Sequence, residues 1–146
     1  MKKILFLSLV VMLFTTACTT KEFVDITTHN RYVTVKSNQW KIGSDDTGNY
    51  FYYTIDEPKL TNYVLENASL NTYLYYVPKG LDSDVLSPLP FSDFIVDDQG
   101  YKWEEHITVE YEPEYVTFLI KPDDHKTEDT PRTFYNEYTF CVRFLW

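Results

Sequence analysis

The sequence predicts an all-β protein: an antiparallel, Ig-like β-sandwich of about seven strands with one short helical turn, after an N-terminal signal helix. Short stretches of alternating apolar and polar residues recur along the chain, and this period of two belongs to a half-buried strand. Aromatic residues make up 18 % of the chain, and aromatic side chains favour strands. Turn residues separate the stretches at intervals of about 8–12 residues, as they do in sandwiches. Closure of the same strands into a barrel is the alternative.

The first seventeen residues have the layout of a secretory leader. Lys2 and Lys3 supply a positive start, and an apolar run over residues 4–14 follows, interrupted only by Ser8. A helix that spans a bilayer needs about 20 apolar residues, so this run is too short to remain as a span. We therefore expect residues 1–17 to be a signal peptide that is removed.

The residues before Cys18 resemble the lipobox at which signal peptidase II cuts bacterial lipoproteins. Thr15, Thr16 and Ala17 supply the small side chains, with Thr15 in place of the usual leucine. The resemblance implies that Cys18 is acylated on its sulfur and its amino group. Several acyl chains, at about 0.8 kcal/mol per buried methylene, make a stable membrane anchor. The alternative is an ordinary secretory signal that leaves Cys18 as a thiol.

The rest of the chain is expected to be one tethered domain. Residues 18–28 are polar and aperiodic, which indicates a flexible tether, and residues 29–146 have the length of a single domain. The formal net charge is −9, and such a surface repels phosphates, so no nucleic-acid partner is expected. If Cys18 is acylated, only Cys141 remains as a thiol. The domain then has no disulfide and depends on its hydrophobic core.

The first half of the domain contains three expected strands and one helix. Residues 31–35 are β-branched and alternating, residues 50–55 follow a turn cluster, and residues 70–77 alternate again. Residues 60–67 form the helical candidate between the second and third strands. Thr61 stands at the N-cap position of that helix.

The second half contains four further expected strands, at residues 91–96, 101–111, 116–120 and 134–146. Residues 79–90 and 122–132 are rich in turn residues and are expected to be loops. The closing strand runs to the last residue. It is expected to pair inside a sheet, because a frayed end would expose its apolar side chains.

Four tyrosines are the candidate ligand-binding residues: Tyr50, Tyr52, Tyr73 and Tyr75. They lie on strand faces opposite the more aliphatic ones. If their two strands are neighbours, the four rings form a patch suited to stacking on sugar rings or docking a protein. The alternative is that the rings pair as ordinary sheet neighbours, or that both faces of the strands are buried.

Glu105 interrupts the apolar face of its strand. A buried lone carboxylate is costly, so we expect an exposed strand end or a bulge at this position, with a functional acid as the alternative. The chain contains no nucleophile elbow, phosphate loop, metal-binding helix or paired-cysteine motif. The paired aspartates sit at turns, and His29, His106 and His125 are scattered. No catalytic residue, metal or cofactor is predicted.

The order of several apolar clusters is similar to that of the small lipoproteins of Bacteroidetes. These clusters are Val35, Trp40, residues 50–53, Leu60 with Thr61, Val64 with Leu65, residues 73–75, Leu89 with Pro90, Tyr101 and residues 116–118. The resemblance implies a lipid anchor followed by one β-sandwich, on the periplasmic or surface face of the outer membrane in the cell envelope.

Together these patterns favour a non-catalytic interaction or structural module at the outer membrane. Its expected partners are the lipid bilayer, through acylated Cys18, and a cell-surface protein or glycan. The alternative is a carbohydrate-binding accessory domain that uses the exposed tyrosines. An enzyme is the remaining alternative, and it requires a concave site that gathers Glu105 or the aspartate pairs.

Overall fold

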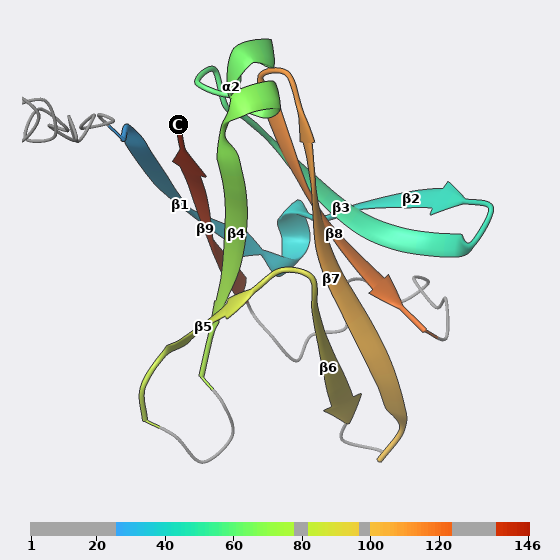
Figure 1. Cartoon of the computed structure of the whole chain (residues 1–146). Helices are drawn as coiled ribbons and strands as arrows, with labels where there is room; N and C mark the ends of the chain where they lie inside the picture. Colours follow the sequence, from blue (N-terminus) through green and yellow to red (C-terminus); the bar gives the residue numbers. More distant parts are fainter. Residues whose placement is uncertain (1–25, 78–81, 97–99, 124–136) are drawn as a thin grey trace, which may run out of the picture.

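Two antiparallel sheets pack face to face in the computed structural model, which describes residues 26–77, 82–96, 100–123 and 137–146 (Figure 1). The four-stranded sheet has the order β1 (Thr28–Lys36), β9 (Glu137–Leu145), β4 (Ser69–Tyr76) and β5 (Val85–Pro88). The five-stranded sheet has the order β2 (Lys41–Asp45), β3 (Gly48–Asp56), β8 (Tyr115–Pro122), β7 (Lys102–Glu112) and β6 (Phe91–Val96). The predicted antiparallel β-sandwich is confirmed, with nine strands in the described residues where about seven were expected.

One strand lies where the sequence pattern predicted a loop. Residues 79–90 were expected to be irregular, but β5 pairs with the end of β4, with Tyr73 opposite Pro88 and Tyr76 opposite Val85. The prediction was wrong here because a four-residue strand that ends in proline is too short to show a period of two. The signal peptide and residues 18–25 of the tether lie outside the described residues.

The short helix and the closing strand follow the sequence prediction. Helix α2 (Asn62–Asn67) begins after Thr61, whose side-chain oxygen accepts a hydrogen bond from the backbone N–H of Val64 at 3.3 Å. A turn of 3-10 helix, η1 (Ser37–Gln39), joins β1 to β2. Strand β9 lies between β1 and β4 and pairs with both along its length. The closing strand is therefore central, as its apolar content predicted.

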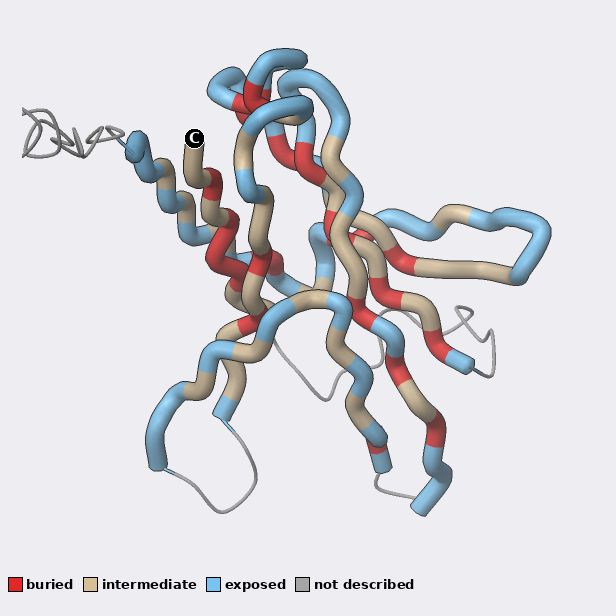
Figure 2. Tube along the Cα trace, in the orientation of Figure 1, coloured by how far each residue is buried: buried red, intermediate tan, exposed pale blue. Residues whose placement is uncertain are grey.

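The core lies between the facing sides of the two sheets, where the buried positions line up (Figure 2). Phe118 of β8 and Phe140 of β9 stack across this gap with ring centroids 4.1 Å apart and planes within 9° of each other. Both side chains are fully buried. Trp40 meets Phe140 edge to face at 6.4 Å. Stacked and edge-on rings are the favoured geometries of aromatic pairs, so these contacts set the spacing of the sheets.

The chain enters and leaves the described domain at the same end of the four-stranded sheet (Figure 1). Thr27 donates its backbone N–H to the carbonyl of Trp146 at 2.7 Å, and the N–H of Trp146 donates back to Thr27 at 3.1 Å. These two bonds extend the β1 and β9 ladder to the last residue. The start of the domain is thereby fixed to its end.

A buried carboxylate ties the two sheets together near this end. Glu57, which follows β3, is 2 % exposed, and its Oε2 lies 3.1 Å from the Arg31 guanidinium of β1. His29 Nε2, also on β1, lies 3.3 Å from Glu57 Oε1. Burial raises the pKa of Glu57, but hydrogen bonds with Arg31 and His29 outweigh it and lower the pKa below its ordinary value. The folded state therefore holds Glu57 as a carboxylate.

We predict that the Glu57→Gln variant is less stable than wild type by about 1–3 kcal/mol at neutral pH, because Arg31 loses a charged partner. A lowered pKa means that the stabilisation is complete above the ordinary glutamate value of 4.5 and is lost as the pH falls through the lower pKa of the folded state. The difference between the two proteins should therefore shrink on acidification.

Urea unfolding at a series of pH values measures this difference. Glu66→Gln, on the exposed surface of α2, is the matched control and should stay close to wild type at every pH. An equal loss of stability in Glu57→Gln at pH 7 and at pH 3 would contradict the assignment.

Candidate functional site

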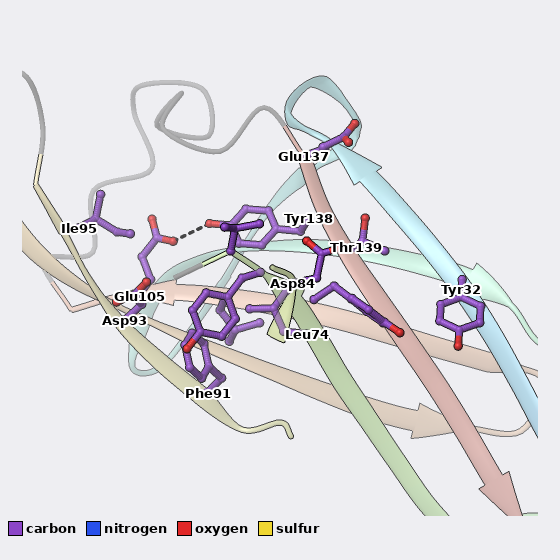
Figure 3. Close-up of a pocket in the computed structure, with 14 residues that line it drawn as sticks. Tyr32, Leu74, Asp84, Phe91, Asp93, Ile95, Glu105, Glu137, Tyr138 and Thr139 are labelled. Atoms are coloured by element: carbon purple, nitrogen blue, oxygen red, sulfur yellow. Dashed lines mark hydrogen bonds between the residues drawn. The ribbon is translucent and has the colours of Figure 1, made fainter. Parts of the chain in front are cut away.

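A cavity of about 660 Å³ lies between the sheets at the end of the sandwich remote from Thr27 and Trp146 (Figure 3). Strands β4 and β9 form one wall, and β6 and β7 form the other. The aromatic side chains that line it are Tyr32, Tyr75, Tyr76, Phe91 and Tyr138. The carboxylates that line it are Asp84, Asp93, Glu105 and Glu137. The cavity thus combines apolar walls with acidic groups.

The pairing of β6 with β7 brings two of the carboxylates together. Asp93 is directly opposite Glu105, and both line the cavity. Directly opposite residues of an antiparallel pair have Cβ atoms about 4.5–5.5 Å apart. The neighbouring inward positions on each strand are apolar, with Phe91 opposite Ile107 and Ile95 opposite Trp103. The acidic pair therefore sits in a hydrophobic surrounding.

Glu105 is buried, which corrects the expectation of an exposed strand end or a bulge. Glu105 is 8 % exposed, the pairing of β7 with β6 continues through it without a break, and it forms the last pair of β7 with β8, opposite Pro122. Trp103 donates its indole N–H to Oε1 at 3.0 Å, and Tyr138 of β9 donates its hydroxyl to Oε2 at 2.9 Å (Figure 3). Hydrogen bonds to a carboxylate offset the cost of removing it from water. The sequence pattern could not reveal the donor from β9.

Two tyrosines form the rim where the cavity meets the outer face of the four-stranded sheet. The ring centroids of Tyr32 on β1 and Tyr75 on β4 lie 5.8 Å apart, with planes inclined by 58°. Tyr32 is 61 % exposed. The Tyr75 hydroxyl raises the pKa of Tyr32, and the buried Cys141 thiol between the two strands is a lesser cause. The Tyr32 phenol is therefore neutral over the physiological pH range.

The structure does not bring the four predicted tyrosines into one patch. Tyr50 and Tyr52 lie on β3 of the five-stranded sheet, whereas Tyr73 and Tyr75 lie on β4 of the other sheet. The premise that the two strands are neighbours is wrong, because both strands carry the same alternating pattern and nothing local assigns a strand to a sheet. Of the four, Tyr75 alone is among the residues that line the cavity.

The other three tyrosines have neighbours on the outer faces of their own sheets. The Tyr50 ring lies over Gly43, where a Cβ atom would come within 2.6 Å of the ring. Tyr52 lies 6.1 Å from Tyr50 along the same strand face. Tyr73 lies under the Arg143 guanidinium, 5.4 Å from the ring centroid. These contacts match the alternative that the rings serve as ordinary sheet neighbours.

Sequence reasoning missed several residues of the site, among them Tyr32, Asp93 and Tyr138. Asp93 has the same pattern as Glu105, a carboxylate between the inward-facing Phe91 and Ile95 of its strand. Tyr32 points outward from a strand whose inward valines are buried or half-buried. No sequence pattern marked Tyr138 as a site residue. Its hydrogen bond to Glu105 exists only because β9 faces β7 across the sandwich.

The histidines and paired aspartates do not form a metal centre in the part of the chain that the structure describes, which holds no cluster of three or more metal-ligating side chains. His106 bonds to Ser92 at 2.7 Å, and Asp45 accepts from the Thr47 N–H in the β2–β3 turn at 2.7 Å. His125 and Cys18 lie outside the described residues. None of the described helices has the length and apolar character needed to cross a bilayer.

The cavity has the make-up of a small-molecule site. Such sites measure about 300–1,000 Å³ and combine apolar walls with a few fixed polar groups. Comparison of the chain with models of protein families, with curated proteins and with solved structures found no match. The chemistry of the site therefore rests on its own residues. Buried carboxylate oxygens and tyrosine hydroxyls can accept and donate hydrogen bonds, and the rings can pack against a flat ligand.

We predict that Tyr138→Phe lowers the free energy of unfolding by about 1–3 kcal/mol, because a buried carboxylate loses a donor. Urea unfolding of the variant measures the change. Tyr115→Phe, at a tyrosine that is 43 % exposed on the five-stranded sheet, is the matched control and should change stability by about 0.5 kcal/mol or less. Equal stability of Tyr138→Phe and wild type would show that the hydroxyl does not support Glu105.

Proposed function

We propose that this protein is a lipid-anchored, non-catalytic binding module of the outer membrane, and that it holds a ligand in the cavity between its sheets. The observation that carries the proposal is the 660 Å³ cavity with Glu105 fixed at its wall. Burial alone does not mark a binding group, because Glu57 is also buried and serves to hold the sheets together. Glu105 differs in that it lines the cavity, where a ligand would contact its carboxylate.

The anchor is supported by the leader and by the place where the tether joins the domain. The residues before Cys18 resemble a lipobox, and the domain begins with Thr27 bonded to Trp146 at the end remote from the cavity. A lipid on Cys18 would therefore be joined to the domain at the end remote from the cavity. The outer membrane, with its periplasmic or surface face, is the proposed location.

Binding is favoured over catalysis by the state of the deepest carboxylate. Both oxygens of Glu105 accept hydrogen bonds, from Trp103 and Tyr138, so the group is held as an acceptor. An enzyme requires a concave site at Glu105, and the cavity provides one, with Asp93 opposite. Paired carboxylates about 5–5.5 Å apart hydrolyse glycosides in retaining enzymes. Hydrolysis of aryl glycosides is therefore assayed in parallel with binding.

We predict that Cys18→Ser moves the protein from the membrane fraction to the soluble periplasmic fraction, because the site of acylation is lost. Fractionation of cells that express each form, followed by immunoblotting, measures the distribution. Cys141→Ser is the matched control and should remain with the membrane. A Cys18→Ser protein that stays in the membrane fraction would contradict lipidation as the anchor.

We predict that small neutral fragments bind in the cavity and shift the NMR signals of Leu74, Ile107 and Tyr138 in the labelled full chain. Val77 lines the cavity at its rim and is 54 % exposed, so Val77→Trp should obstruct entry and weaken binding about tenfold or more. Val96→Trp, at a valine that is 50 % exposed on the edge strand β6, is the matched control and should bind as wild type does.

Two outcomes would contradict this proposal. Fragments that shift only the NMR signals of residues outside the cavity would contradict a binding cavity. So would the absence of binding by any fragment. Release of phenol from aryl glycosides by the wild type, abolished in Glu105→Gln, would replace the binding module with a hydrolase.

A further inference from the structure

The rim tyrosines offer two inclined aromatic rings to solvent. Strand β9 runs between β1 and β4, and its outward residues there are Thr139 and Cys141, which are small. The large rings of Tyr32 and Tyr75 therefore meet above β9, with Cys141 fully buried beneath them. An aromatic face that stays in water is a contact surface for a ligand with a flat apolar side.

Hydrogen-bonding oxygens lie beside the rings and elsewhere along the cavity. Asp84 and Glu137 are exposed and line the same cavity. The hydroxyls of Thr34 and Thr139 lie 3.0 Å apart beside the rings. A pyranose ring has an apolar face of C–H groups and an edge of hydroxyls. Hydroxyls that donate to carboxylates form short, charge-assisted bonds, so the rim suits both parts of a sugar.

The charges of the site argue against anionic ligands and give cationic ones only a weak advantage at the exposed rim. The charged residues that line the cavity within the described part of the chain are acidic, and the whole chain carries a net charge of −9, which repels uronic acids and phosphates. A cationic ligand would meet Asp84 and Glu137 where water weakens charge pairing. Glu105, deeper in the cavity, already accepts bonds from Trp103 and Tyr138. Stacking on the rings and hydrogen bonds from the hydroxyls of a neutral ligand to the carboxylates remain as the main sources of affinity.

On the basis of the proposed function, we propose that the ligand of this cavity is a neutral oligosaccharide. One sugar ring packs against Tyr32 and Tyr75 at the rim, and the adjoining end of the chain enters the cavity toward Glu105. The carboxylates accept from its hydroxyls. The ligand class thus follows from two features of the cavity, the aromatic rim and the carboxylate acceptors behind it.

The test is calorimetric titration of the full chain, held in a zwitterionic detergent without a sugar headgroup, with neutral gluco-, xylo- and manno-oligosaccharides. Oligosaccharides of uronic acids and of glucosamine serve as charged probes. At least one neutral series should bind, and Tyr32→Ala and Tyr75→Ala should each weaken that binding about tenfold or more. Tyr63→Ala is the matched control, because Tyr63 is 64 % exposed on α2, and it should bind as wild type does.

Each result has a distinct meaning. If no neutral glycan binds while neutral fragments still occupy the cavity, the sugar assignment is wrong and the binding module stands. If neither binds, both are wrong. Tighter binding of uronic acids or glucosamine oligomers overturns the neutral class. Neutral-glycan binding that Tyr32→Ala and Tyr75→Ala leave unchanged, in variants that unfold at the wild-type urea midpoint, places the sugar elsewhere and overturns the rim site.

Discussion

The stacked rings of Phe118 and Phe140 are the contact on which the rest of the structure depends. They join the central strands of the two sheets, β8 and β9, at 4.1 Å between centroids. Because side chains alternate along a strand, the inward position of Phe140 decides the direction of every residue on β9. Tyr138 faces the cavity for this reason, and Thr139 and Cys141 face outward beneath the rim tyrosines. A shift of β9 by one residue would exchange its inward and outward side chains and remove the site.

Two buried carboxylates near opposite ends of the sandwich show how the fold accommodates polar groups between its sheets. Glu57 pairs with the Arg31 guanidinium and lies beside His29, so strand β1 of one sheet is held to the end of β3 in the other. Glu105 accepts from Trp103 on its own strand and from Tyr138 on the facing sheet. Each carboxylate thus connects the two layers. Only Glu105 lines the 660 Å³ cavity, so the two have separate roles.

Local sequence patterns predicted most of the strands and the helix. The site, in contrast, depends on pairing between residues far apart in the sequence. Alternation located the edge strand at residues 91–96, and the Thr61 cap located α2. The same alternation could not say that Tyr52 and Tyr75 belong to different sheets, because strand order depends on contacts between distant residues. The environment of Glu105 depends on Tyr138, thirty-three positions along the chain. A lone buried carboxylate is costly, but the donor from Tyr138 offsets that cost and lets Glu105 stay buried.

The two backbone bonds between Thr27 and Trp146 fix the start of the domain at the end of the sandwich remote from the cavity. Strand β1 starts beside them and runs nine residues toward the cavity, a length of about 30 Å at 3.3 Å per residue. If Cys18 carries the lipid, the segment to Ile26 reaches at most about 28 Å from the bilayer when fully extended. A ligand in the cavity would then be separated from the proposed anchor by the length of β1 as well as by that segment. The strand itself would add a rigid spacer to the tether.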